Sequence, residues 1–120
     1  MADDSPWHSI PAECIKAWND TFQASREGLD LKSPCPVCGM PELHHWFYPW
    51  HLEEKVIRGQ RFVARGSEWQ WCSHCRSFQH FSGLVPDWWA CDLIVDTKKL
   101  TAYPDAIEEA RLANQRQHLP

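Results

Sequence analysis

The stretch that decides the fold is Cys35-Pro36-Val37-Cys38-Gly39, which is matched by Cys72-Ser73-His74-Cys75, with 33 residues between Cys38 and Cys72. In each Cys-x-x-Cys turn two sulfur atoms can reach one metal ion, and two such turns supply the four tetrahedral thiolates that Zn²⁺ accepts in structural sites. Gly39 suits the tight turn that follows the first pair, where a positive φ is often required. The spacing therefore predicts one structural Zn²⁺ bound by Cys35, Cys38, Cys72 and Cys75.

This arrangement resembles the zinc-ribbon family, in which two cysteine knuckles on β-hairpins clamp one metal ion. The resemblance covers about residues 33–85 and implies a fold and a metal, but no single function. The gap between the two pairs is longer than the roughly 15 to 20 residues of the compact pattern. An inserted hairpin or loop is therefore expected.

The same cysteines have other readings. A thioredoxin-like redox pair needs a βαβ context, whereas the two pairs here lie among hairpin signals. Four thiolates also bind iron, which would give a coloured protein. Four cysteine ligands close the metal shell, and this argues against catalysis at the metal.

Two histidines and two further cysteines lie outside the paired motifs. His74 and His80 are near enough in sequence to touch the site, although packing or surface roles are the simpler interpretation. Cys14 and Cys91 are interpreted as buried free thiols.

Hydrophobic periodicity predicts a helix on each side of the cysteine-containing region. Residues 11–22 place Ile15, Trp18 and Phe22 on one stripe, with Ser9 as N-cap, and Gly28 is a plausible stop. Residues 104–113 begin with proline and acids and are followed by basic residues, the order that the helix dipole favours.

Strand character occurs between the pairs and just after them. The predicted strands are 43–50, 60–64, 68–71 and 78–85, with a hairpin turn at Arg65-Gly66-Ser67. Residues 51–59 fit either a helical turn or a polar loop, and residues 87–95 are expected to be irregular or briefly helical. The predicted fold class is α+β, a small zinc ribbon of antiparallel β-hairpins with flanking N- and C-terminal helices. We expect a single domain over 1–120, made of a helix and linker (1–32), the ribbon (33–86), and an apolar segment with a helix (87–120).

Charge and composition limit the classes of partner. The formal net charge is −4, and four thiolates with one Zn²⁺ would make it more negative, which argues against nucleic acid and anionic membranes as partners. The first residues do not resemble a secretory signal and no stretch is long and apolar enough for a membrane span. A cytoplasmic location is expected, where paired cysteines usually bind metals.

The chain is rich in aromatic residues, with eight tryptophans and five phenylalanines. Alternation along strands predicts that Trp69 and Trp71 share one face and that most aromatic residues form the core. A ribbon has little interior, so some of them are expected to form an interaction surface.

The segment Trp69 to Trp89 looks like a signature of small bacterial zinc-ribbon proteins associated with immunity to polymorphic toxins, and the Pro-Asp-Ala start of the last helix looks similar too. This resemblance implies a protein that binds a cognate toxin domain in the cytoplasm and blocks it, with zinc keeping the binding surface rigid. Opposite charge would speed the encounter with a basic cleft. Nothing in the sequence indicates an oligomeric state. The candidate partner-binding residues are Trp50, Asp87, Trp88, Trp89, Asp92, Asp96 and Glu108.

The main alternative is a nucleic-acid-binding or transcription-associated zinc ribbon that uses Lys55, Arg58, Arg61, Arg65 and Arg76. Four glutamates occupy the same part of the chain, which favours a mixed, solvated surface. No phosphate-binding loop, His-Glu-x-x-His helix or nucleophile motif is present in the sequence, so we expect no enzymatic activity. A third class, an enzyme with a cleft between ribbon and helices, would require a perturbed titratable group in a pocket.

Overall fold

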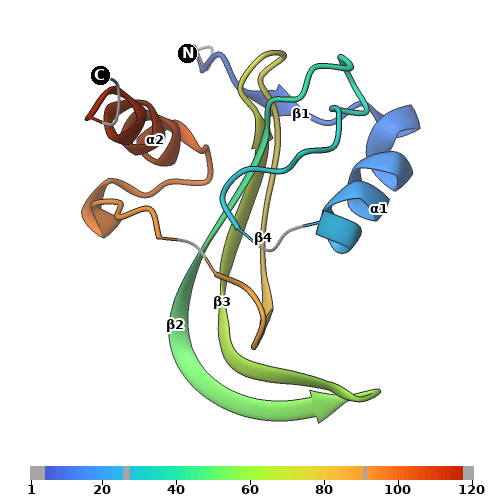
Figure 1. The fold of residues 1–120 in the computed structure, drawn as a ribbon, viewed down its shortest axis with the longest axis vertical. Helices are drawn as coiled ribbons and strands as arrows, with labels where there is room; N and C mark the ends of the chain where they lie inside the picture. The colour runs from blue at the N-terminus through green and yellow to red at the C-terminus, as the bar shows by residue number, and fades with distance from the viewer. Residues whose placement is uncertain (1–4, 26–27, 91, 118–120) are drawn as a thin grey trace.

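The computed structural model describes residues 5–25, 28–90 and 92–117, and it confirms the α+β class with one helix at each end of the chain (Figure 1). The sheet has the order β1-β4-β3-β2, formed by β1 (His8–Ser9), β2 (Leu43–Ile57), β3 (Gln60–Cys72) and β4 (Ser77–Pro86). β1 pairs with β4 in parallel, and the other pairs are antiparallel. The first cysteine pair precedes β2, and the second forms the connection from β3 to β4.

The long hairpin of β2 and β3 replaces the shorter strands that the sequence predicts. Residues 51–57 continue β2, and the chain reverses at Arg58 and Gly59, whose φ values are 51° and 83°. Two positive φ angles are typical of the two-residue turns that match the twist of a hairpin. Register shifts at Pro49/His51 and Leu52/Lys55 accompany the curvature of the far end of the hairpin (Figure 1).

The predicted turn at Arg65-Gly66-Ser67 is wrong, because these residues lie inside β3. Gly66 pairs with Pro49 on one side and with Gly83 on the other. A Cβ atom on Gly66 would lie 2.5 Å from the carbonyl oxygen of Tyr48, so glycine is required here for close approach of two strands. The glycine therefore reflects the close approach of β2 to β3 and not a reversal of the chain.

The two faces of the sheet carry separate cores. One core contains Trp18 and Phe22 of α1 (Ile15–Ser25) together with Leu43 and Cys72, whereas the other is rich in tryptophan and includes Ile107 of α2 (Asp105–Gln117). Strand alternation explains the division, because successive side chains point to opposite faces. α1 and α2 consequently lie on opposite sides of the sheet (Figure 1).

The N-terminal helix is partly as predicted. A 3₁₀ turn, η1 (Ala12–Cys14), precedes α1, and Trp18 and Phe22 are fully buried. Ile15, the first residue of α1, is 36% exposed and does not belong to the buried stripe. Ser9 is not the N-cap, since it belongs to β1 and Pro11 precedes the 3₁₀ turn.

The C-terminal part is attached to the sheet by tryptophan indoles. After β4 the described chain has no regular element until η2 (Thr97–Lys99), which Asp96 caps. The indole N–H groups of Trp46, Trp69 and Trp71 donate to the Leu93 carbonyl, the Thr101 carbonyl and the Glu108 carboxylate at 2.9–3.0 Å. Buried indoles thus combine apolar packing with directed hydrogen bonds. Neither described helix is long and apolar enough to cross a membrane.

Candidate metal centre

The four cysteines of the two Cys-x-x-Cys turns come together at one end of the sheet. Their sulfur atoms all lie within 4.8 Å of one another, with 3.8 Å between Cys35 and Cys75 and 3.7 Å between Cys38 and Cys72. Cys35 and Cys72 are buried, and the other two are half-buried. Each close pair joins one cysteine of the first turn to one of the second. The cluster therefore connects the segment that precedes β2 to the segment that follows β3.

The sulfur positions fit a tetrahedral metal ion. A Zn–S bond of about 2.3 Å implies about 3.8 Å between neighbouring ligand sulfurs in a regular tetrahedron. The two short sulfur–sulfur distances match this value without any movement of the backbone. The four thiolates would hold the ion and fill its coordination shell, which is the donor set of a structural site. The sequence prediction of a tetracysteine metal site agrees with this geometry.

Both turns have the same backbone form. The Gly39 N–H donates to the Cys35 carbonyl at 2.7 Å, and the Arg76 N–H donates to the Cys72 carbonyl at 3.0 Å. The residue after each pair has a positive φ, 81° at Gly39 and 67° at Arg76. Sequence reasoning found Gly39 and missed Arg76, because arginine carries no signal for this conformation.

Arg76 makes a contact that accompanies its unusual backbone. Its guanidinium lies 4.9 Å from the centre of the Trp7 ring, and the Trp7 indole donates to Asp105 at the start of α2. In addition, the His8 ring contacts the Cys75 carbonyl at 2.8 Å. The N-terminal residues therefore link the second cysteine turn to the helix on the far side of the sheet.

The protonation of the thiols is uneven. Burial raises the pKa of Cys35 and of Cys72 above the ordinary thiol range. Burial also opposes ionisation of Cys75, but hydrogen bonds from the Ser77 hydroxyl and backbone and from the neighbouring thiols outweigh it and lower its pKa to about 7. Because a metal ion binds thiolates, loading of this site must release protons from Cys35 and Cys72.

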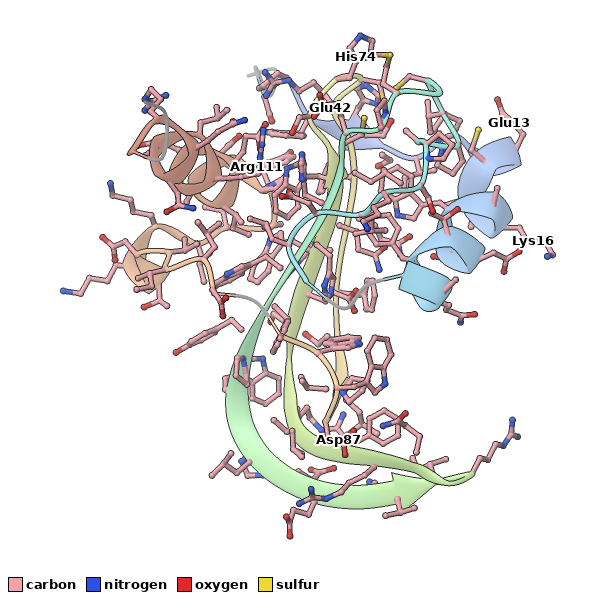
Figure 2. All side chains as sticks on the ribbon, in the orientation of Figure 1. Glu13, Lys16, Glu42, His74, Asp87 and Arg111 are labelled. Carbon is pink, nitrogen blue, oxygen red and sulfur yellow. The ribbon has the colours of Figure 1, made fainter. Side chains whose placement is uncertain are left out.

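The other predicted neighbours of the site lie outside the sulfur cluster. His74 is exposed and is found at the end of the molecule beside the cysteine turns (Figure 2). His80 stacks on Trp69 with 4.5 Å between ring centres, which is a packing role. Cys14 is half-buried with its sulfur 3.7 Å from the Pro36 carbonyl. Cys91 lies outside the described residues.

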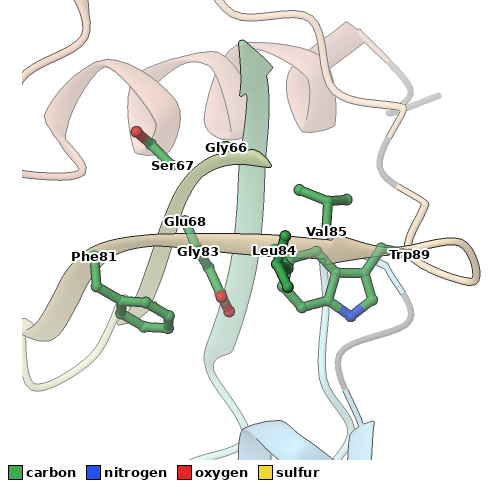
Figure 3. Close-up of a pocket in the computed structure, with 8 residues that line it drawn as sticks. All are labelled: Gly66, Ser67, Glu68, Phe81, Gly83, Leu84, Val85 and Trp89. Carbon is green, nitrogen blue, oxygen red and sulfur yellow. The ribbon is translucent and has the colours of Figure 1, made fainter. Parts of the chain in front are cut away.

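The candidate partner-binding residues do not form one surface. Asp87 and Trp88 are exposed. Asp87 lies far from the cysteine turns (Figure 2) and its N–H donates to the Arg61 carbonyl of β3, while the Trp88 indole donates to Gln60 of the same strand. Trp89 is half-buried beside Glu68, whereas Trp50 is 50% exposed and donates to Ser67. Ser67 and Glu68 point to opposite sides of β3, so Trp50 and Trp89 belong to different faces (Figure 3).

The three acidic candidates further along the chain are separated from Asp87. Asp92 borders α2, and Asp96 accepts a hydrogen bond from the Lys98 N–H. Glu108 is only 6% exposed and receives hydrogen bonds from Trp71 and Arg111, so it is unavailable to a partner. Its burial would raise the pKa, but the contacts with Arg111, Ser73 and Trp71 outweigh burial and hold the pKa below the ordinary carboxyl range.

A buried polar cluster on the α1 face was not foreseen. His45 is fully buried with its Nε2 atom 2.9 Å from the Glu68 carboxylate, and Gln70 donates to the same carboxylate at 2.7 Å. Trp18 of α1 in turn donates to Gln70 at 2.9 Å. Alternation along β3 predicts that Glu68 and Gln70 point to one face of the sheet and that Trp69 and Trp71 point to the other. The sequence does not show that α1 covers the face of Glu68 and Gln70.

Comparison of the chain with models of protein families, with curated proteins and with solved structures found no significant match.

Proposed function

We propose that this chain is a protein-binding module in which one structural Zn²⁺ stabilises the end of the sheet and the far end of the β2–β3 hairpin presents the binding surface. The observation that carries the proposal is the distribution of exposed apolar side chains. Of the ten large apolar side chains exposed in the described part of the chain, five lie on β2: Tyr48, Trp50, Leu52, Val56 and Ile57.

The exposure on β2 is large. Leu52 is 87% exposed and Val56 is 68% exposed, and Trp88 adds a 41% exposed indole beside the hairpin. Concentrated apolar surface of this kind marks interaction sites in soluble proteins, whereas scattered single residues do not. Tryptophan and tyrosine are also the residue types that contribute most at interface hot spots. The proposed surface is thus far from the metal, which acts through stability alone.

The partner proposed for this surface is a cognate toxin domain, and the protein is proposed to be a bacterial immunity protein acting in the cytoplasm without enzymatic activity of its own. Support comes from the resemblance carried by residues 69–89 and from the net charge of −4, which suits a basic partner. The segment 69–89 contains the end of β3, the second cysteine turn, β4 and Trp88. Binding across the toxin's substrate entrance would then inhibit it.

A nucleic-acid role is less well supported by the arrangement of the basic residues. Arg61 pairs with Glu54 at 2.7 Å, and Glu53 pairs with both Arg65 and Lys55 at 3.2 and 3.3 Å. The pairing reduces the positive potential that phosphates would meet. Titration with single-stranded DNA, duplex DNA and RNA tests this alternative, which requires binding that weakens steeply with salt.

The experiment for the main proposal compares two exposed apolar side chains. Products of adjacent genes would be screened as toxins, and co-expression of this chain should restore growth of cells that produce the cognate one. Leu52→Glu should weaken binding by about tenfold or more, the range of an interface hot spot. Ile94→Glu is the matched control, since Ile94 is 91% exposed but lies outside the hairpin. Equal affinities for the two variants would show that the β2 surface is not the binding site.

A further inference from the structure

A small pocket opens on the sheet between β3, β4 and the residues after β4 (Figure 3). Its volume is about 110 Å³, and Gly66, Gly83, Phe81, Leu84 and Trp89 contribute to its walls. Since one liquid water occupies about 30 Å³, the pocket has room for about four waters or for the end of one long side chain. A Cβ atom built on Gly83 meets nothing within 4 Å, which leaves that wall open.

Glu68 is the acidic side chain that lines this pocket. The carboxylate extends from β3 between Phe81 and Trp89 (Figure 3) while the residue as a whole is only 3% exposed. Its Oε2 atom accepts a hydrogen bond from Gln70 at 2.7 Å and lies 2.9 Å from Nε2 of His45. These contacts come from the interior side and fix the carboxylate in place. Attraction between charges is much stronger at such a site than in water.

The walls favour a cation of organic character. Trp89 is held by aromatic contacts, with ring centres 4.8 Å from His45 and 5.2 Å from Phe47. Aromatic faces attract ammonium and guanidinium groups, and the attraction increases when water is excluded. Glu68 is the one lining side chain that brings oxygen atoms into the pocket, because Ser67 points to the other side of β3 (Figure 3). A single carboxylate offers too few ligands for Ca²⁺ or Mg²⁺.

We infer that this pocket receives the ammonium or guanidinium end of a lysine or arginine side chain from the protein partner. The inference rests on the proposed function, and it adds the chemistry by which the partner is recognised. The exposed residues Asp87 and Trp88 directly precede Trp89, and the Trp88 ring centre lies 6.4 Å from that of Trp89. They extend the acidic and aromatic surface around the pocket. A basic partner would thus insert one cationic side chain into the pocket, and the far end of the β2–β3 hairpin would supply apolar contacts next to it.

The first test uses the zinc-loaded full chain and three capped amino acids as probes. N-acetyl-lysine methylamide and N-acetyl-arginine methylamide should shift the amide resonance of Gly83 and the indole resonance of Trp89 in a saturable way, whereas N-acetyl-norleucine methylamide should not. Glu68→Gln keeps the shape of the side chain and should weaken the cationic probes by about tenfold or more. Equal binding of the norleucine probe, or unchanged binding by Glu68→Gln, would overturn the inference.

A second variant tests the inference independently, in case Glu68→Gln does not fold. Gly83→Leu leaves Glu68 and its hydrogen bonds intact and fills the open wall, so it should also abolish the probe shifts while the metal content and melting temperature stay normal. Probe binding that survives Gly83→Leu would place the cation elsewhere and contradict the inference.

The final arm separates the pocket from the proposed function. Weaker partner binding by Glu68→Gln, with coupling to one lysine or arginine of the partner in a double-mutant cycle, supports the inference. If the probes bind but partner affinity does not change, the pocket takes a free small cation and the assignment to a partner side chain is overturned. Failure of the Leu52→Glu test with intact probe binding would instead reject the proposed binding surface and leave a cation pocket without that partner.

Discussion

The position of the sulfur atom distinguishes the four clustered cysteines from Cys14. Four sulfurs within 4.8 Å of one another define the candidate metal site, although Cys14 is also half-buried in the neighbouring core. The Cys14 sulfur points toward the Pro36 carbonyl oxygen, 3.7 Å away, and does not belong to the sulfur cluster. Chemical type alone therefore does not make a ligand.

We expect Cys72→Ser to lose the bound metal and to melt at a much lower temperature, because serine is a poor ligand for zinc and Cys72 is fully buried. Metal content per chain and thermal unfolding measure both effects. Cys14→Ser is the control, and it should retain one metal ion per chain with only a small change in melting temperature. Equal metal loss in both variants would show that the sulfur cluster is not the binding site.

The strand β3 lies between β2 and β4 and pairs with both along most of its length, so little space is left around its backbone. Its Gly66 faces Gly83 across one pair, yet the two glycines have different surroundings. A Cβ atom on Gly66 would lie 2.5 Å from a backbone oxygen, whereas one on Gly83 would meet nothing within 4 Å. Neither has a positive φ, so the difference is one of space and not of backbone conformation.

Gly66→Ala is therefore expected to destabilise the protein by about 1–3 kcal/mol, the usual range for overpacking against atoms that cannot move aside. Gly83→Ala should be neutral or slightly stabilising, since alanine loses less conformational entropy than glycine on folding. Chemical denaturation of both variants in the metal-loaded form gives the comparison. Similar stabilities would mean that β2 can shift away from β3 at Tyr48.

The division of the protein into two cores on opposite sides of one sheet affects how metal binding supports the fold. Cys35 and Cys72 belong to the core that contains Trp18 and Phe22, and Cys38 and Cys75 pack against it. The second core, around Trp71 and Ile107, contains no metal-ligand cysteine. Loss of the metal is therefore expected to weaken the α1 side first.

Removal of the metal with a strong chelator should raise hydrogen exchange in α1 and in both cysteine turns while α2 retains most of its protection, because local opening follows the contacts that are lost. Hydrogen exchange followed by mass spectrometry at several chelator incubation times measures this order. A parallel loss of protection in α1 and α2 would contradict the expectation and show that the two cores unfold as one unit.

The local order of residues is sufficient to predict the cluster of four cysteines, the α+β class and the two terminal helices. Short spacings such as Cys-x-x-Cys and the repeat of Trp18 and Phe22 act within one turn or one element, so they are visible in the sequence. The same holds for strand character in residues 43–50 and 78–85, which lie in β2 and β4.

Other features depended on contacts between distant segments. The sequence predicts a turn at Gly66, whereas the Tyr48 carbonyl that requires a glycine there belongs to another strand. The sequence places Glu108 among the partner-binding candidates, because Trp71, whose indole donates to the buried carboxylate, lies 37 residues away on β3. Likewise, the pocket over Glu68 exists because β3, β4 and Trp89 converge there. Burial and pairing across the sheet are properties of the packed chain, and no short stretch of sequence encodes them.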